Sequence, residues 1–242
     1  MVTLTETPID KPGYVREMFG SLARRYDLLN HLLSAGLDRG WRRRAAAAVP
    51  GDAALVVDVC TGTGDLAMAV LRRSAGARVV GCDFCRPMLE RARAKFARAG
   101  LAPRAALLEA DALALPLPGA SADAVTCAFG LRNLADPAHG LAEMVRVARP
   151  LGRVVVLEFH RPRGQGAWAG LFNLYFRRVL PRLGGWVSRD RHGGYAYLVS
   201  SIEAFGPPER TADALRRAGL DRVRTDPLAG GIASVFVGTR PA

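Results

Sequence analysis

Residues 55–67 read LVVDVCTGTGDLA, and this stretch decides the fold of the chain. A short, mostly apolar run from Leu55 to Cys60 leads into the glycine loop Thr61-Gly62-Thr63-Gly64, which predicts a buried strand followed by a turn. A helical pattern begins at Asp65, directly after the loop. Glycines let a ligand approach the backbone closely, and the first turn of a helix offers free N–H groups to negative charge. The stretch therefore predicts a strand, a ligand-binding loop and a helix in succession.

Strands and helices alternate after this loop. Further strands are expected over residues 78–82, 104–109, 122–128, 153–159, 221–225 and 232–238. Helices are expected from 65 to about 74, from 87 to 99, from 137 to 148 and from 211 to 218. Continuous apolar strands that alternate with helices indicate a parallel sheet covered by helices on both faces.

Two helices are predicted before the first strand. Apolar residues recur at helical spacing over residues 14–30, which predicts one amphipathic helix. After a break at Ser34-Ala35-Gly36, a second helix runs up to Pro50-Gly51. We therefore expect an N-terminal helical extension over residues 1–50, followed by a single domain over residues 51–242.

The alternation stops over about 161–205, where a helical insertion without strands is expected. Apolar residues recur there at three- and four-residue steps, which predicts another amphipathic helix. They are Trp168, Leu171, Phe172, Tyr175, Phe176, Val179 and Leu183. The arginines that flank this stripe are Arg161, Arg163, Arg177, Arg178, Arg182, Arg189 and Arg191.

Charge and cysteine content narrow the class of protein. The 242-residue chain has a formal net charge of +12, which indicates attraction to an anionic membrane or nucleic acid, or arginines on solvated helix faces. The chain has no apolar run of membrane-spanning length and no signal-peptide pattern at its start, so we expect a cytoplasmic protein. Cys82 and Cys85 form one CxxC pair without the further ligands of a zinc site, so no metal is expected. Cys60, Cys82 and Cys127 are instead expected to fill the ends of adjacent strands.

The glycine loop alone leaves two cofactor classes open. Gly62-x-Gly64-x-x-Ala67 fits the dinucleotide fingerprint of NAD enzymes. Asp83 ends the second expected strand, where a carboxylate can accept from ribose hydroxyls, but NAD and S-adenosylmethionine both carry a ribose. The alternative role for Asp83 is to cap the helix ahead of Pro87. Asp111, at the end of the third strand, is placed to accept from an adenine amino group.

Six segments carry a more specific pattern. They are MFGSLARRYDLLNHLLSAGLDRGWR (18–42), VVDVCTGTGDLA (56–67), EADALALPLPGASADAVT (109–126), FGLRNLADPAHGLAEMVRVARPLGRVVVLEF (129–159), YAYLVSSIEAF (195–205) and AGLDRVRTDPLAGGIASVFVG (218–238). Together they resemble the ubiquinone/menaquinone biosynthesis C-methyltransferase family, from about Val15 to Gly238. The cofactor motifs alone would fit many class I methyltransferases, whereas RYDLLNHLLSAG and FGLRNL are narrower.

The resemblance implies an α/β, Rossmann-like class I methyltransferase fold, with a seven-stranded, mostly parallel sheet in which strand seven is antiparallel. It also implies S-adenosylmethionine as the cofactor, bound across strands one, two and four. The residues implied to hold it are Gly62, Thr63, Gly64, Asp83, Asp111, Ala112 and Ala128. Asp83 would bind the ribose, and Asp111 with the backbone of Ala112 would bind the adenine. Ala128 stands where the family often has Ser, so a contact there would come from the backbone.

The implied reaction is methylation of a ring carbon on a prenylated quinol, either demethylmenaquinol or a 2-methoxy-6-polyprenyl-1,4-benzoquinol. Arg132 and Asn133 occupy family positions suited to holding a quinol oxygen, where a cation would favour the phenolate. In the alternative interpretation, Arg132 pairs with Asp136 and Asn133 caps the next helix.

Three further side chains are candidates for the substrate site. His160 is the candidate general base near the end of strand five, with a surface or helix-capping role as the alternative. Tyr195 and Tyr197 are expected to line the substrate pocket or to pack within the insertion.

A prenylated substrate implies a membrane partner, because burial of its tail in the bilayer is favourable by ~0.8 kcal/mol of free energy per CH₂. The basic insertion helix is therefore expected to dock peripherally on the anionic inner face of the membrane, unless it is a lid that packs on the sheet. A homodimer is a further expectation. The rival functions are another class I methyltransferase acting on a small natural product and a basic nucleic-acid-binding protein, but no RNA-binding motif occurs and no nucleic-acid partner is expected.

Overall fold

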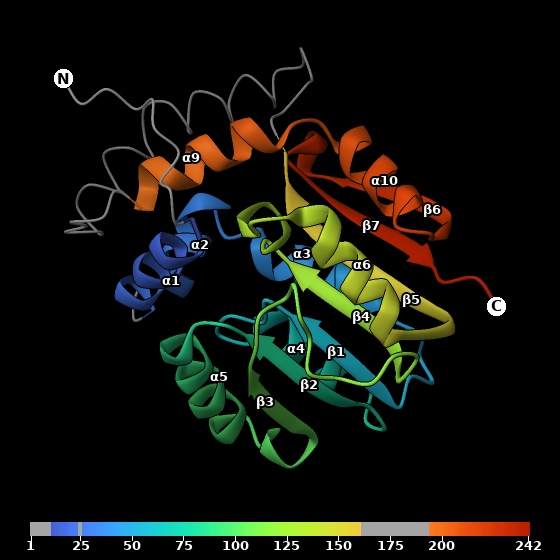
Figure 1. The fold of residues 1–242 in the computed structure, drawn as a ribbon. Coiled ribbons are helices and arrows are strands. Elements are labelled where there is room, and N and C mark those ends of the chain that lie inside the picture. The colour runs from blue at the N-terminus through green and yellow to red at the C-terminus, as the bar shows by residue number, and fades with distance from the viewer. Residues whose placement is uncertain (1–10, 24–25, 161–193) are drawn as a thin grey trace.

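The computed structural model describes residues 11–23, 26–160 and 194–242, and within them one sheet runs through the molecule (Figure 1). Its strands are β1 Leu55–Val59, β2 Arg78–Asp83, β3 Ala105–Glu109, β4 Ala122–Ala128, β5 Ala148–Phe159, β6 Asp221–Leu228 and β7 Ala233–Thr239. The seven strands lie in the order β3-β2-β1-β4-β5-β7-β6. β7 is antiparallel to both β5 and β6, whereas the other neighbouring strands are parallel. This topology confirms the predicted mostly parallel sheet with an antiparallel strand seven.

Helices cover both faces of the sheet. Their bounds are α1 Lys11–Leu22, α2 Tyr26–Leu33, α3 Asp38–Ala48, α4 Asp65–Arg73, α5 Arg86–Arg98, α6 Pro137–Val147, α9 Gly194–Phe205 and α10 Pro208–Arg217. α3, α4 and α5 share one apolar core with the sheet, and α6 and α10 share the other. α1, α2 and α9 lie together at one end of the sheet (Figure 1).

The central strands are apolar on both faces because each face meets a helix layer. Val56 and Val57 are adjacent in β1 and both fully buried, yet they belong to opposite cores. In β4 the same holds for Ala124 and Val125, which pair in register with these two valines. A fully buried valine contributes about 1.5–3 kcal/mol relative to an exposed one. The strands therefore have to be continuous apolar runs rather than alternating ones.

The prediction of one helix over residues 14–30 was wrong. α1 ends at Leu22 and α2 begins at Tyr26, with Ala23 in a turn. A continuous helix would place Phe19 and Tyr26 about 10 Å apart along its axis, at 1.5 Å per residue. The centroids of their rings are instead 5.6 Å apart in an edge-to-face pair, which the bend between the two helices allows.

The amphipathic helix predicted between Trp168 and Leu183, with its flanking arginines, lies outside the described residues. The end of the expected insertion is described and forms α9. Within the ranges that the structure describes, no helix has the length and apolar character needed to span a bilayer.

Candidate active site

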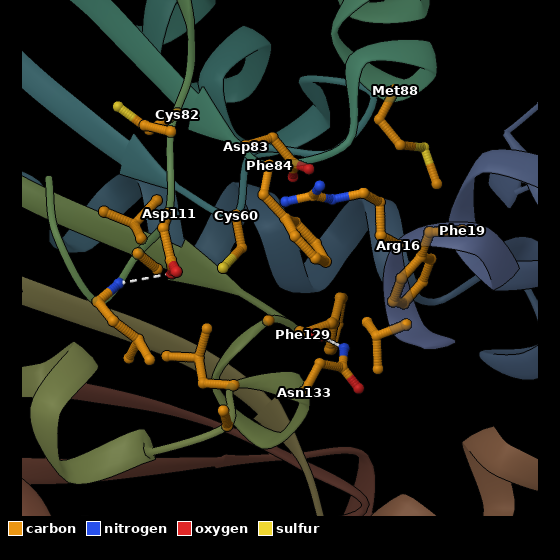
Figure 2. A pocket seen from close by; sticks show the side chains of 18 of the residues that line it. Arg16, Phe19, Cys60, Cys82, Asp83, Phe84, Met88, Asp111, Phe129 and Asn133 are labelled. Carbon is orange, nitrogen blue, oxygen red and sulfur yellow. Dashed lines mark hydrogen bonds between the residues drawn. The ribbon is translucent and has the colours of Figure 1, made fainter. Parts of the chain in front are cut away.

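A cavity lies at the carboxyl ends of β1, β2 and β4 (Figure 2). β1 lies between β2 and β4 in the sheet, and the carboxyl ends of parallel strands are where open α/β sheets bind ligands. The residues that these strands, the neighbouring β3 and the loops after them bring to the cavity include Cys60, Asp83, Asp111, Ala112, Ala128 and Asn133. The structure thus brings together residues that are separated by up to 73 positions in the sequence, from Cys60 to Asn133.

The glycine loop lies beside this cavity in a conformation that requires glycine. Gly62 and Gly64 have φ values of +54° and +82°, a region that other residues seldom adopt. A Cβ on Gly64 would lie 2.7 Å from Cζ of Phe96, so the loop also packs tightly on α5. Thr61 donates a 2.6 Å hydrogen bond to the buried Asp58, which fixes the loop to the end of β1.

Asp83 connects the loop to β2. Its two carboxylate oxygens accept from the backbone N–H groups of Gly62 at 2.8 Å and Cys85 at 2.9 Å. Burial raises the pKa of Asp83 to about 6, although these N–H donors act in the opposite direction. The alternative of a helix cap was wrong, because α5 begins at Arg86 and its N-cap residue is Cys85.

Asp111 and Ala112, in the loop after β3, also line the cavity. Asp111 is exposed, and its Oδ1 accepts a 2.9 Å hydrogen bond from the backbone N–H of Leu113, which holds the turn after β3 (Figure 2). Ala128 lines the cavity at the end of β4 and offers only backbone polar groups. These three residues line one cavity, although β2 and β1 lie between β3 and β4 in the sheet.

Asn133 and Arg132 have different positions relative to the cavity. Asn133 lines it; its Nδ2 donates to the carbonyl of Phe129 at 3.1 Å, and Tyr197 donates to its Oδ1 at 3.4 Å. Arg132 is buried behind it, with Nη1 donating to Glu158 at 2.6 Å and to the same Phe129 carbonyl at 2.7 Å. Both residues therefore hold Phe129, whose φ of +59° is strained for a bulky side chain.

The alternative interpretation of Arg132 and Asn133 was wrong in both parts. Arg132 pairs with Glu158 on β5 rather than with Asp136. Asp136 itself is the N-cap of α6 and accepts from the backbone N–H groups of Ala138 and His139.

His160 lies away from the cavity wall. Its ring is buried between Phe205 and Phe236, with centroids at 6.3 and 5.3 Å, and its Nδ1 is 3.4 Å from the carbonyl oxygen of Gly206. Burial lowers the pKa of His160. The alternative of a surface residue was therefore wrong.

The two tyrosines of α9 differ in what the structure describes. The ring centroid of Tyr197 lies 5.7 Å from that of Tyr14 in α1. Tyr195 lies in the same helix as Tyr197, but its side chain is outside the described part of the structure.

The first two helices form a wall of the cavity that the sequence pattern did not reveal. Val15, Arg16, Phe19 and Tyr26 all line it. The guanidinium of Arg16 lies 5.3 Å from the ring centroid of Phe84, which follows Asp83, as Figure 2 shows. Helical spacing identified these residues as an apolar face, but only the fold shows that this face closes the site.

The cysteines lie where expected. Cys60, Cys82 and Cys127 lie at the adjacent ends of β1, β2 and β4, and all four cysteines are free thiols. Burial raises the pKa of Cys82 to about 12, which keeps it protonated. Among the described residues, no group of three or more His, Cys, Asp or Glu side chains could hold a metal ion.

Comparison with known proteins agrees with this geometry. The model of the ubiE/COQ5 methyltransferase family matches residues 7–240. A demethylmenaquinone methyltransferase of Deinococcus radiodurans is 50% identical over 96% of this chain and 94% of its own. A ubiquinone/menaquinone biosynthesis C-methyltransferase of Citrifermentans bemidjiense is 41% identical over 96% of this chain and 98% of its own.

Solved structures show the same fold at low sequence identity. A SAM-dependent methyltransferase of Thermotoga maritima superposes with a TM-score of 0.63 at 17% identity, over 93% of this chain and 99% of that one. The match of the family model over nearly the whole chain and the identity to curated relatives lead to one assignment. The chain belongs to the ubiE/COQ5 methyltransferase family.

Proposed function

We propose that this protein transfers a methyl group to a ring carbon of a prenylated quinol, with demethylmenaquinol as its acceptor. The observation that carries the proposal is the composition of the cavity wall. Polar residues at strand ends, Asp83 and Asp111, face an aromatic wall that includes Phe19 and Tyr26. One cavity can therefore hold a polar methyl donor next to an apolar aromatic acceptor. The 50% identity to a demethylmenaquinone methyltransferase favours the naphthoquinol over the benzoquinol.

The cofactor of this family is S-adenosylmethionine, which supplies an electrophilic methyl group on its sulfonium. We infer that Asp83 binds the ribose, and that Asp111 with the Ala112 backbone binds the adenine. Gly62, Thr63 and Gly64 would lie along the methionine part, and the Ala128 backbone would lie near the donor. The fit is supported at Gly62, where a Cβ would lie 3.8 Å from Cε1 of Tyr26, so that any larger side chain would narrow the space above the loop.

On the acceptor side, Asn133 is the polar group placed to hold a quinol oxygen, because it lines the cavity and is itself fixed by Tyr197 and Phe129. Arg132 would act from behind Asn133: its positive charge favours ionisation of a nearby hydroxyl, and an ionised oxygen makes the ring more nucleophilic. Tyr197 would position Asn133, with Tyr195 on the same helix. His160 has no part in this proposal, because its ring packs between Phe205 and Phe236.

An enzyme that acts on a prenylated quinol should work at a membrane surface, since burial of the apolar tail in the bilayer is favourable by ~0.8 kcal/mol of free energy per CH₂. A net charge of +12 supports peripheral docking on the anionic inner face. Co-sedimentation with vesicles should therefore increase with their content of anionic lipid, and binding that ignores this content would contradict the electrostatic part. A homodimer stays a prediction that sedimentation equilibrium would test.

The activity itself is tested with methyl-labelled S-adenosylmethionine and two acceptors, demethylmenaquinol and a 2-methoxy-6-polyprenyl-1,4-benzoquinol, in vesicles. Label should enter the naphthoquinol faster than the benzoquinol. The oxidised naphthoquinone is the matched control and should take up no label, because its ring is electron-poor. Absence of label from both quinols would overturn the proposal and favour a different small-molecule acceptor.

A further inference from the structure

The wall that α1 and α2 place over the cavity is attached to the glycine loop by one charged residue. We refer to residues 11–22 and 26–33 as the roof. Val15, Arg16 and Phe19 of α1 and Tyr26 of α2 line the cavity from this side. The next residue, Asp27, points to the loop rather than to the cavity: Thr63 donates a 2.5 Å hydrogen bond to its Oδ1.

Lys95 of α5 joins Asp27 and Thr63 in a cluster of polar side chains. Its ammonium group donates to Oδ2 of Asp27 at 2.9 Å and to Oγ1 of Thr63 at 3.2 Å. It also forms an ion pair with Asp65, the first residue of α4. Lys95 therefore lies between two carboxylates, one from the roof and one from the start of α4. The side chain of Lys95 is only 18% exposed, so its charge is partly shielded from solvent.

Two further contacts of the roof do not involve the glycine loop. Phe19 and Tyr26 of the roof pack against a small apolar cluster of Ala23, Cys85 and Met88, which seats the roof on α5. At the other end of α2, His31 lies 2.6 Å from the buried Asp38 of α3. Apolar packing of this kind is not directional, whereas a charged hydrogen bond has one geometry. Asp27 is therefore the residue that can fix the position of the roof relative to the glycine loop.

We propose that Asp27 is a positioning residue that holds the roof closed on the glycine loop through Thr63 and Lys95. Its contacts set the rate at which S-adenosylmethionine and its demethylated product, S-adenosylhomocysteine, leave the cavity. The inference rests on the proposed cofactor placement, because a roof that spans the cavity blocks exit only for a ligand bound beneath it.

The two partners should differ in the size of their effect. Loss of Asp27 leaves Lys95 still paired with Asp65. Loss of the Lys95 charge leaves Asp27 and Asp65 as two carboxylates with no cation between them, and like charges at such range repel. The effect of Lys95→Met should therefore exceed that of Asp27→Ala. Because the side chain of Asp27 is 47% exposed, the wild-type release rate should also increase with ionic strength.

Stopped-flow release of S-adenosylhomocysteine from the full chain is the direct measurement. Asp27→Ala should raise the release rate about tenfold and Lys95→Met more, as expected for loss of charge-assisted hydrogen bonds. Asp27→Glu keeps the charge and should restore most of the slow release. Asp226→Asn is the matched control, because it removes an exposed ion pair with Arg44 far from the roof, and it should leave release unchanged. Hydrogen exchange of peptides within 14–33 should increase in Asp27→Ala and not in this control.

Two outcomes separate this proposal from the cofactor placement. If Asp83→Ala weakens cofactor binding while Asp27→Ala and Lys95→Met release product at the wild-type rate, the positioning role of Asp27 is wrong and the placement stands. If Asp83→Ala binds the cofactor normally, the placement is wrong. A rise in release rate that matches a general loss of thermal stability, and that Asp27→Glu does not reverse, would also overturn the positioning role.

Discussion

The guanidinium of Arg132 lies 2.6 Å from the carboxylate of Glu158, and their side chains are only 3% and 0% exposed. Glu158 also accepts from the backbone N–H groups of Arg132 and Phe159, so its charge is well satisfied. A buried pair of this kind is not a source of large net stability, but neither member tolerates loss of the other. Arg132 therefore serves the fold and the proposed chemistry with the same side chain.

Replacement of Arg132 alone should destabilise the protein strongly. Arg132→Met leaves the Glu158 carboxylate buried without its cation, which should cost about 3–5 kcal/mol of unfolding free energy. Urea denaturation measures this loss. The double variant Arg132→Met with Glu158→Met should recover most of the stability and still lack methyl transfer. An Arg132→Met protein as stable as the wild type would contradict the prediction.

Replacement of Asp83 should weaken cofactor binding. Asp83→Ala removes the acceptor proposed for the ribose and also frees the N–H groups of Gly62 and Cys85, so we expect a loss of about 1–3 kcal/mol. Isothermal titration calorimetry with S-adenosylmethionine measures the change in Kd. Asp52→Ala, at an exposed position before β1, is the control and should bind like the wild type. Equal affinity of both variants would show that the ribose lies elsewhere.

Cofactor affinity should also depend on pH through Asp83. In the proposed placement its ionised form accepts hydrogen bonds from ribose hydroxyls, so bound cofactor should favour ionisation of a group whose pKa burial has raised to about 6. Binding should therefore be tightest above this pH, weaken as the pH falls through it, and release a proton near it. Calorimetry in two buffers of different ionisation enthalpy detects that proton. Asp58 also has a pKa raised by burial to about 6, so a pH dependence that survives in Asp83→Asn would assign the effect to Asp58.

Asn133 should affect turnover rather than cofactor binding. Asn133→Ala removes the proposed contact to the quinol oxygen and one of the hydrogen bonds that hold Phe129, so kcat should fall by about 10²-fold. The Kd for S-adenosylmethionine should stay within about twofold, because Asn133 lies on the acceptor side. Tyr197→Phe removes only the 3.4 Å hydrogen bond to Asn133 and should have a smaller effect in the same direction. A loss of cofactor affinity equal to the loss of kcat would contradict this division.

Substitution of two glycines should distinguish the stability cost of backbone strain from that of side-chain crowding. Gly36 and Gly64 have nearly equal φ values, +80° and +82°, but a Cβ on Gly36 would meet nothing within 4 Å, whereas one on Gly64 would meet Phe96 at 2.7 Å. Gly36→Ala should cost about 1 kcal/mol from its backbone conformation alone. Gly64→Ala should cost a further 1–3 kcal/mol or so from overpacking. Thermal denaturation of both variants measures the difference, and Gly64→Ala with Phe96→Leu should reduce it.

The sheet could be predicted because each strand is marked by an apolar run of neighbouring residues in the sequence. β4 runs over Ala122–Ala128, as the apolar pattern indicated, since every residue of that run except Ala128 is buried in the sheet between the two helix layers. Asp83 and Asp111 could be predicted for a related reason. Each follows a recognisable strand, and the carboxyl ends of parallel strands meet at one edge of the sheet.

The contacts between distant segments could not be predicted in this way. The local pattern offers Arg132 only Asp136, four residues away, as an alternative partner, whereas the actual partner, Glu158, is twenty-six residues away in a buried strand. Asp27 and Lys95 are sixty-eight residues apart, and nothing in either local pattern marks them as partners. The rings that wall the cavity from α1 and α2 look in the sequence like any apolar helix face, because spacing reports which side is buried and not against what.

The two walls of the cavity come from separate parts of the chain. The residues of one wall can therefore be substituted without changing the residues of the other. In the proposed placement, the side built from strand ends would bind the donor, whereas α1, α2 and the Tyr197 region of α9 would contribute to the fit of the acceptor. Exchange of residues 11–33 and 194–205 for those of a relative would therefore transplant acceptor preference while the sheet and the donor stay the same. A library that varies these two segments together with Asn133 would sample new acceptors without changing the strands of the sheet.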